Sequence, residues 1–195
     1  MKFPSSSLLV AAAFCACAIL SSAADPEPAS PAAAPTPATA MVVDLRGESV
    51  TVYGYGSWKD RINPTATGLA ILGSKGAQGD GGVCGNLAPV YNLGGAAWIE
   101  VALGLGQTNE ATTVVIGLND VDGTLVTARV RVDQIVPGQP VWFRVPLSDF
   151  HPAGGEYAGR VPGMDFTTIT QWHVQGEWGV KKPHQFVVIA LRARR

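Results

Sequence analysis

Arginine and tryptophan alternate with apolar residues in two neighbouring segments of this chain. Arg129 and Arg131 interrupt the apolar run LVTARVRV, and Trp142 and Arg144 interrupt the run VWFRVPL. A period of two places such residues on one face of a β-strand and the apolar residues on the other. Sugars present apolar C–H faces and hydroxyl groups, so stacking indoles and hydrogen-bonding guanidinium groups would suit a saccharide. The alternative is an ordinary solvated sheet face, on which arginine stems cover aromatic surface.

Three further polar residues alternate in the same way. Glu100 lies opposite its apolar neighbours, and His173 and Gln175 do so in a later segment. If these strands join the sheet that carries the arginines, we expect one ligand-binding platform of Glu100, Arg129, Arg131, Trp142, Arg144, His173 and Gln175. Otherwise, Glu100, His173 and Gln175 are edge or surface residues.

Catalytic groups form no recognisable constellation in the sequence. Glycoside hydrolysis needs two carboxylates facing one cleft, and the candidates are scattered: Asp60, Asp80, Glu100, Asp149, Glu156 and Glu177. The histidines His151, His173 and His184 accompany neither a serine nucleophile elbow nor an HExxH motif. We therefore expect a non-catalytic protein without a cofactor, and an enzyme is the less favoured alternative.

Two loops have some features of ligand sites but are better interpreted as turns. The segment NDVDG at 119–123 contains two aspartates, yet it lacks the acidic ladder and distal glutamate of an EF-hand. Its Asp122-Gly123 pair is a strong hairpin signal, as Pro137-Gly138 is for another tight connection. The glycine-rich segment 73–85 lacks the Gly-Lys-Ser/Thr of a phosphate loop, so we interpret it as a mobile hairpin connection. The sequence predicts no metal site, and it does not decide whether the domain holds a structural calcium ion.

Cys84 is the single cysteine outside the first 24 residues. No conventional Cys-His pair or metal-ligand spacing surrounds it in the sequence. A small buried hydrophobic residue is the favoured interpretation, ahead of a reactive nucleophile. Trp58, which follows glycines and tyrosines, is likewise expected to pack against the domain.

Alternating apolar runs separated by turn residues predict nine strands and no helix of useful length. The expected strands are 49–53, 68–72, 82–87, 97–105, 112–119, 125–132, 141–147, 168–175 and 185–191. This pattern predicts an all-β domain with a two-layer core.

The first 40 residues have the composition of a targeting segment followed by a spacer. Lys2, the apolar run 8–20 and the small residues Ser22 to Ala24 are typical of a signal peptide cleaved after Ala24. Residues 25–40 are nearly all Pro, Ala, Ser and Thr, which favours an extended linker. We expect a signal peptide at 1–24, a linker at 25–40 and a β-sandwich domain at 41–195. The expected location is secreted or periplasmic, with no membrane span after cleavage.

The charge balance argues against nucleic acid as a partner. The formal net charge is −1 for the whole chain, and it becomes −2 once Lys2 is removed. The basic tail, Arg192, Arg194 and Arg195, has too few charges for a phosphate track and is interpreted as a solvated end.

The order of motifs resembles the galactose-binding-domain-like jelly rolls. The resemblance covers most of residues 50 to 192 and is carried by GDGGVCGNLAPVYNLGGAAWIEVALGL, TTVVIGLNDVDGT, PGQPVWFRVPLSDF, ITQWHV and PHQFVVIALRA. The chain is similar in pattern to glucan-binding carbohydrate-binding modules and to the complex I intermediate-associated protein family. These are patterns of strands and turns rather than a catalytic signature.

The resemblance implies a two-sheet antiparallel jelly-roll β-sandwich that holds a polysaccharide or oligosaccharide on an exposed sheet face. Because this fold hosts many functions, an envelope protein-interaction or assembly module without a sugar ligand is the alternative. A glycoside hydrolase is less favoured than either.

Overall fold

The computed structural model describes residues 41–47, 51–71, 77–154 and 164–195. The expected signal peptide and linker, and Glu156 among the candidate carboxylates, lie outside these residues. The strands are β1 Val42–Asp44, β2 Tyr53–Gly56, β3 Ile62–Thr65, β4 Gly68–Ile71, β5 Gly81–Tyr91, β6 Trp98–Leu105, β7 Thr113–Asp120, β8 Leu125–Arg131, β9 Val141–Pro146, β10 His151–Pro152, β11 Ile169–Gln175 and β12 Phe186–Arg194. A 3₁₀ turn, η2 Leu147–Asp149, follows β9. Within the described ranges, no helix is long and apolar enough to cross a membrane.

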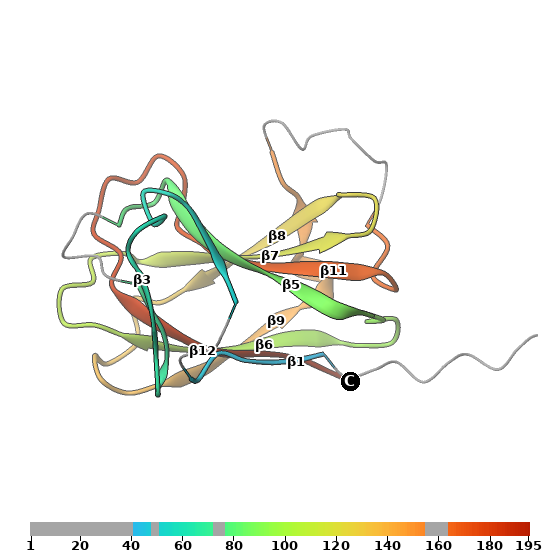
Figure 1. Cartoon of the computed structure of the whole chain (residues 1–195), viewed down its shortest axis with the longest axis horizontal. Helices are drawn as coiled ribbons and strands as arrows, with labels where there is room; N and C mark the ends of the chain where they lie inside the picture. Colours follow the sequence, from blue (N-terminus) through green and yellow to red (C-terminus); the bar gives the residue numbers. More distant parts are fainter. Residues whose placement is uncertain (1–40, 48–50, 72–76, 155–163) are drawn as a thin grey trace, which may run out of the picture. The chain divides into compact units, whose positions relative to one another are not determined.

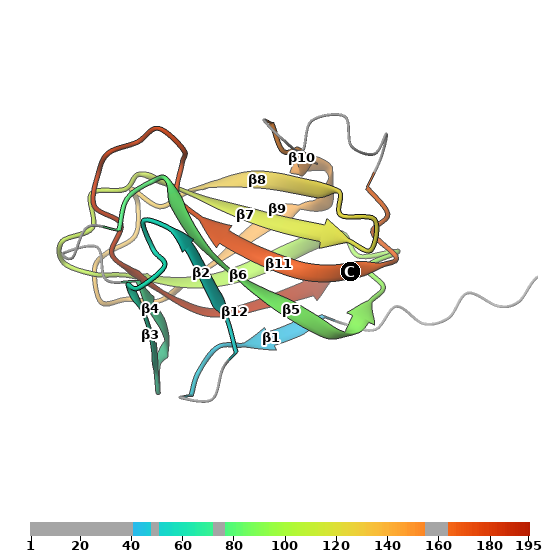
Figure 2. The same ribbon diagram turned by 45° about the horizontal axis from the view of Figure 1, so that its top comes forward.

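The strands form two antiparallel sheets that pack face to face (Figures 1 and 2). Sheet A has the order β3-β4-β12-β6-β9, and β1 also pairs with β12. Sheet B has the order β10-β8-β7-β11-β5-β2. The described residues therefore form the expected all-β, two-sheet antiparallel sandwich.

The inward faces of the two sheets build the core, as the alternating sequence predicts. On β9, Val145 is 4% exposed while Arg144 points away from the core, and on β8 the buried Val130 is flanked by exposed arginines. The largest fully buried side chains include Trp58, Trp172 and Phe186. Each sheet consequently presents a second face, which carries polar side chains, to the outside.

Trp58 is buried, which confirms the expected packing role. Its side chain is fully inaccessible, and its indole Nε1 donates a 2.6 Å hydrogen bond to the Gln78 carbonyl. The ring meets Phe186 edge-on, with centroids 5.3 Å apart. Gly81 makes room for it, since a Cβ at that position would lie 2.3 Å from the indole. A glycine at the start of β5 is therefore required by the packing of Trp58.

The Asp122-Gly123 turn joins β7 to β8, as expected. Gly123 has φ +82°, a conformation that favours glycine. Asp120 supports the turn, because its Oδ1 accepts hydrogen bonds from the backbone N–H groups of Asp122 and Thr124 at 3.1 and 2.8 Å. Its Oδ2 accepts a third from Asp165 N at 3.1 Å. The carboxylate thus acts as a buried acceptor for backbone donors.

Several strand boundaries differ from those expected. β1, β3 and β10 were not predicted, because two to four residues are too few to show a period of two. Of the strand expected at 49–53, residues 49 and 50 lie outside the described residues, and the observed strand β2 begins at Tyr53. β5 extends four residues beyond the expected end, through the cis Ala88-Pro89 bond.

Candidate functional site

A cleft of about 1200 Å³ lies on the outer face of sheet B. Strands β2, β5, β7, β8 and β11 supply its floor, and residues 149–154 and 177–178 add to its lining. The lining residues are Tyr55, Cys84, Val115, Leu125, Thr127, Ala128, Arg129, Asp149, His151, Pro152, Ala153, Gly154, Gln171, His173, Gln175, Glu177 and Trp178. This volume exceeds the range of about 300–1,000 Å³ that is usual for small-molecule pockets.

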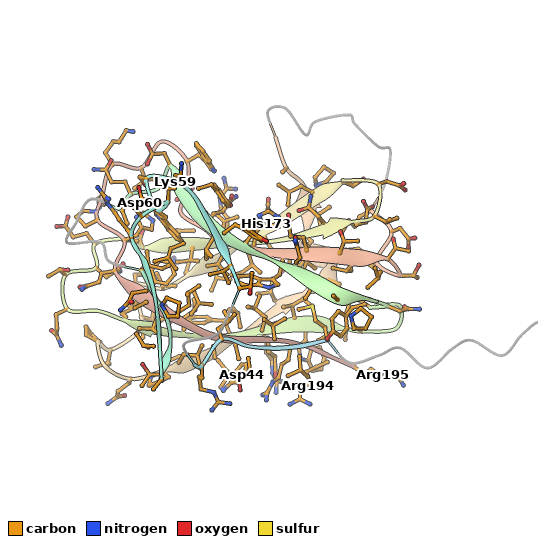
Figure 3. The ribbon with its side chains drawn as sticks, viewed as in Figure 1. Asp44, Lys59, Asp60, His173, Arg194 and Arg195 are labelled. Atoms are coloured by element: carbon orange, nitrogen blue, oxygen red, sulfur yellow. The ribbon has the colours of Figure 1, made fainter. Side chains whose placement is uncertain are left out.

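Strand β11 supplies the polar centre of the cleft. In the run ITQWHVQ of β11, polar residues alternate with the core residues Trp172 and Val174. The polar side chains therefore share the outer face of the sheet, and they are Gln171, His173 (labelled in Figure 3) and Gln175. Two of them are held by neighbours on other strands. Gln171 Nε2 donates to Asn86 Oδ1 at 2.8 Å, and Tyr55 Oη donates to Gln175 Oε1 at 2.9 Å.

Glycines on the adjacent strands keep the floor open around these side chains. Gln175 pairs with Gly82 on β5, and His173 pairs with Gly117 on β7. A Cβ at Gly82 would lie 2.3 Å from Tyr55 Oη, so the tyrosine occupies the space that a side chain would fill. The absence of a side chain at Gly82 thus lets the Tyr55 ring lie across β5 next to Gln175.

The walls combine charged and aromatic groups. Arg129 Nε lies 3.3 Å from Glu177 Oε1, an ion pair that joins β8 to the loop after β11. Trp178 follows Glu177 and is 61% exposed, which is unusual for so large an apolar side chain. Asp149 and His151 add hydrogen-bonding groups on the β10 side. The cleft therefore offers amides, an imidazole, an ion pair and aromatic surface to one ligand.

His173 is held in an environment that favours its neutral form. Burial lowers its pKa to about 4, and its Nε2 has no hydrogen-bond partner among the described residues. The Tyr55 ring meets it edge-on, with centroids 6.2 Å apart. At neutral pH the ring is uncharged, and it can offer both a donor and an acceptor.

Acid is expected to destabilise the domain partly through His173. Because its pKa is about 4 in the folded chain against 6.5 ordinarily, the unfolded chain takes up the proton at higher pH. The contribution of His173 is therefore complete above about pH 6.5 and is lost as the pH falls toward about 4. Urea denaturation across this window should show a shallower loss of stability for His173→Gln than for wild type, and parallel curves would contradict the assignment.

Cys84 is buried as expected, but it faces the cleft rather than the sandwich core. It is 8% exposed, and burial raises the pKa of its thiol. The cross-strand partner of Cys84 on β11 is His173. Its Sγ lies 3.7 Å from the Tyr53 carbonyl oxygen. A protonated, small side chain at this position forms part of the cleft floor.

The condition for a single platform is not met, because the structure divides the strands that carry its members between the two sheets. Arg129, His173 and Gln175 line the cleft, and Arg131 lies on the same face but outside the lining, paired with Asp133. Glu100, Trp142 and Arg144 lie on the outer face of sheet A. The cause is the connection through residues 132–140, including Gly138 with φ +84°, which carries the chain from sheet B to sheet A. Consecutive alternating strands therefore do not share a face here.

Several lining residues were not identified from the sequence. Gln171 has the same alternation as His173 and Gln175, so this signal was available. Tyr55 and Trp178 were not, because their positions depend on which strands and loops meet across the sheet. In the sequence Asp149 and Glu177 are scattered carboxylates without a recognisable partner, and the fold brings both to one cleft. Within the described segments, no group of three or more His, Cys, Asp or Glu residues is arranged to hold a metal ion.

Comparisons with known proteins give structural matches without sequence matches. No family model and no curated protein matches the chain. A xylan-binding module matches with a TM-score of 0.52 at 10% identity, over 80% of this chain and 95% of that one. An agarase matches with a TM-score of 0.52 at 12% identity, over 79% of this chain but 25% of that one. A family 11 carbohydrate-binding module from Clostridium thermocellum, in complex with a β-1,3-1,4-mixed-linked tetrasaccharide, has a TM-score of 0.49 at 14% identity, with 80% and 87% covered.

These matches concern the fold. The expected resemblance to the complex I intermediate-associated protein family finds no confirmation among them, whereas the resemblance in fold to carbohydrate-binding modules is confirmed by the xylan-binding module. The described domain has the antiparallel jelly-roll β-sandwich fold of carbohydrate-binding modules.

Proposed function

We propose that this chain is a secreted or periplasmic, non-catalytic protein that binds a neutral polysaccharide or oligosaccharide in the cleft of sheet B. The observation that carries the proposal is the composition of the cleft, which is lined by the amides of Gln171 and Gln175 and by the aromatic rings of Tyr55 and Trp178. Amides donate and accept hydrogen bonds, as hydroxyl groups require, and aromatic rings suit the C–H faces of sugars. A module with the same fold binds xylan, according to its name, which supports the same class of ligand.

Hydrogen bonds and an ion pair within the cleft hold several of its side chains in place before a ligand binds. Asn86 orients Gln171, Tyr55 orients Gln175, and Glu177 holds Arg129. Groups that are already oriented lose little conformational freedom when a ligand binds. Each still keeps donors or acceptors for a ligand, since one contact does not exhaust an amide or a guanidinium group.

Hydrolysis is the second candidate, because Asp149 and Glu177 line the same cleft. A hydrolase needs one carboxylic acid and one carboxylate on either side of the glycosidic bond. Here, the Glu177 carboxylate is engaged by Arg129 at 3.3 Å, which gives it a positioning role in the wall. We therefore expect binding without release of reducing ends.

Binding is expected to depend on Trp178 and Arg129 but not on Arg131. A glycan array would select the ligand, and calorimetry would then compare wild type with Trp178→Ala, Arg129→Ala and Arg131→Ala. Loss of an aromatic anchor worth about 2 kcal/mol would weaken binding about thirtyfold. Arg131 lies two residues from Arg129 on the same face but outside the cleft, so Arg131→Ala is the matched control.

The same experiment separates the alternatives. No heat with any array glycan would favour a protein-interaction module, and release of reducing ends would favour a hydrolase. Equal weakening by Arg129→Ala and Arg131→Ala would show that the cleft is not the binding surface.

A further inference from the structure

The outer face of sheet A carries a separate cluster of charged and aromatic residues, on the opposite side of the sandwich from the cleft. We call Trp98, Glu100, Trp142, Arg144, Arg192 and Arg194 the arginine cluster. They come from the adjacent strands β6, β9 and β12. None of them lines the cleft on sheet B.

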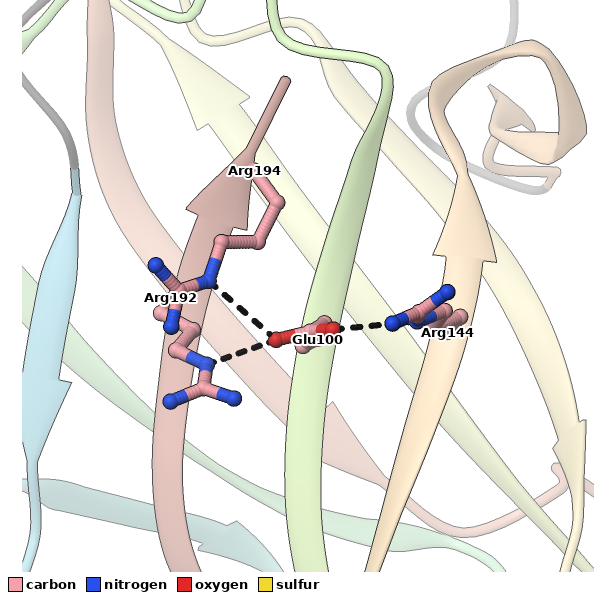
Figure 4. Close-up of polar contacts among 4 residues, drawn as sticks. All are labelled: Glu100, Arg144, Arg192 and Arg194. Carbon is pink, nitrogen blue, oxygen red and sulfur yellow. Dashed lines mark hydrogen bonds and ion pairs between the residues drawn. The ribbon is translucent and has the colours of Figure 1, made fainter.

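Glu100 organises the cluster from its centre. Its oxygens lie 3.1 Å from Arg144 Nε, 2.6 Å from Arg192 Nε and 3.3 Å from Arg194 Nε (Figure 4). The carboxylate is nearly inaccessible, with 6% of the Glu100 side chain exposed. Hydrogen bonding from Arg192, joined by Arg144 and Arg194, lowers the pKa of Glu100 despite its burial, so it stays ionised.

Strand register brings these groups together. Glu100 on β6 pairs with Arg144 on β9 and with Arg192 on β12. Two pairs further along β12, Arg194 lies opposite Trp98. Side chains at paired positions and two residues apart share a face, so the arginines reach the glutamate from both sides.

The charges of the cluster do not balance. Three guanidinium groups surround one carboxylate, which leaves two positive charges without a counter-charge inside the cluster. Each arginine contacts Glu100 through Nε, and within the described part of the chain no Nη nitrogen of the three donates a hydrogen bond. The Arg144 and Arg194 side chains are 70% and 50% exposed, so solvent or a ligand can reach them. Donors of this kind bind carboxylate and sulfate oxygens well.

Two indoles make the guanidinium groups rigid and add apolar surface. The Arg192 Cζ lies 3.8 Å from the centroid of Trp142, and the Arg144 Cζ lies 5.2 Å from that of Trp98. Trp142 is 44% exposed, and its paired residue on β6 is Ala102, which is too small to cover it. Stacked and ion-paired arginines lose less freedom on binding than free ones do.

We propose that the arginine cluster is a second binding site, which takes an acidic saccharide. The Nη groups of Arg144, Arg192 and Arg194 bind a carboxylate or sulfate of the saccharide, and a neighbouring ring lies against Trp142. Three arginines are too few to follow a nucleic-acid backbone, whereas they match one or two anionic groups beside an apolar ring. The site is independent of the cleft on sheet B and of what that cleft binds.

The first test uses the unchanged protein and a pair of ligands that differ only in charge. Calorimetry with oligogalacturonate and with its methyl ester, at about 0.15 M salt to suppress unspecific attraction, should show binding of the free acid and at least tenfold weaker binding of the ester. A second comparison, of the affinities for dextran sulfate and for uncharged dextran, tests whether the site accepts a sulfate in place of a carboxylate. Equal affinity for acid and ester would overturn the proposal, as would binding to neither acid nor dextran sulfate.

The second test locates the site. Arg144→Gln with Arg192→Gln should weaken binding of the acid about tenfold or more, because both hydrogen-bonding forks are lost. Lys59→Gln with Lys182→Gln removes the same charge from exposed residues elsewhere and should leave binding unchanged. Arg144→Lys with Arg192→Lys retains the charge and should give an intermediate affinity.

The remaining outcomes contradict the proposal. Equal weakening by the two glutamine pairs would indicate attraction by net charge rather than a site. Unchanged binding by the arginine variant would place the acid elsewhere, and binding to anionic phospholipid vesicles without binding to either acidic glycan would indicate a membrane surface. Circular dichroism checks that each variant is folded. If an arginine variant does not fold, the comparison of acid and ester still tests the proposal, because it uses the unchanged protein.

Discussion

Replacing Val145 with aspartate is expected to unfold the domain, whereas Arg144→Ala is expected to leave it folded. Val145 is 4% exposed, and its paired residue Ile99 is fully buried, so a carboxylate at 145 would enter the core between the sheets. Burying a charge without a partner costs several kcal/mol, against a total stability of about 5–15 kcal/mol for a domain. Arg144 is 70% exposed on its side chain, and losing its ion pair should cost no more than about 1 kcal/mol.

Chemical denaturation of the two variants measures this difference. We expect a cooperative transition close to that of wild type for Arg144→Ala, and little or no transition for Val145→Asp. The reverse order would mean that β9 presents its other face to the core, and it would remove Trp142 and Arg144 from the outer face of sheet A.

Trp58→Ala is expected to give the second large loss of stability, about 3–5 kcal/mol. The substitution removes a fully buried ring, its edge contact with Phe186 and its hydrogen bond to the Gln78 carbonyl. The β2–β3 connection, which contains Trp58, would lose its anchor to β5 and β12. Thermal or urea denaturation measures the effect directly.

Trp178→Ala provides the matched control, because the same atoms are removed from a side chain that is 61% exposed. We expect its stability to stay within about 0.5 kcal/mol of wild type. A similar loss for both variants would show that Trp178 supports the fold, and that its place in the cleft reflects packing rather than binding.

The alternation of polar and apolar residues was enough to predict the sandwich and the facing of its long strands. On β9 and β11, Val145 and Trp172 are buried as expected, and the residues expected outside are not buried. Val141, at the start of β9, is 37% exposed although alternation assigns it to the core face. Period two is a local property, and antiparallel sheets with one solvated face display it clearly. Turns could be predicted for the same reason, since the Asp122-Gly123 pair alone indicated the hairpin in which Gly123 has a positive φ.

Membership of a sheet could not be predicted in the same way. The alternation of Arg129 and Arg131 is indistinguishable from that of Trp142 and Arg144, although β8 and β9 belong to different sheets. Which sheet a strand joins depends on long-range pairing, and a nine-residue connection permits either outcome. For this reason the sequence left open whether the polar residues share one platform, and the structure places them on two separate surfaces.

Identifying the residues that line the cleft required the same knowledge of long-range strand pairing. Gln175 was identified from its strand, but its partners Tyr55 and Trp178 come from positions that alternation does not describe. Glu100 was expected as a ligand-binding residue, yet its carboxylate is buried beneath three arginines, two of which were interpreted as a solvated tail. Only the register between β6 and β12 reveals that contact.

The cleft on sheet B is the central claim, and side-chain NMR signals test it most directly. The labelled protein would be titrated with the neutral oligosaccharide that the glycan array selects, while the amide signals of Gln171 and Gln175 and the indole N–H of Trp178 are followed. We predict that these three shift with one common affinity and that the indole N–H of Trp142, on sheet A, does not. A shift of the Trp142 signal without the other three, or no shift at millimolar ligand, would contradict the assignment of the cleft as the saccharide site.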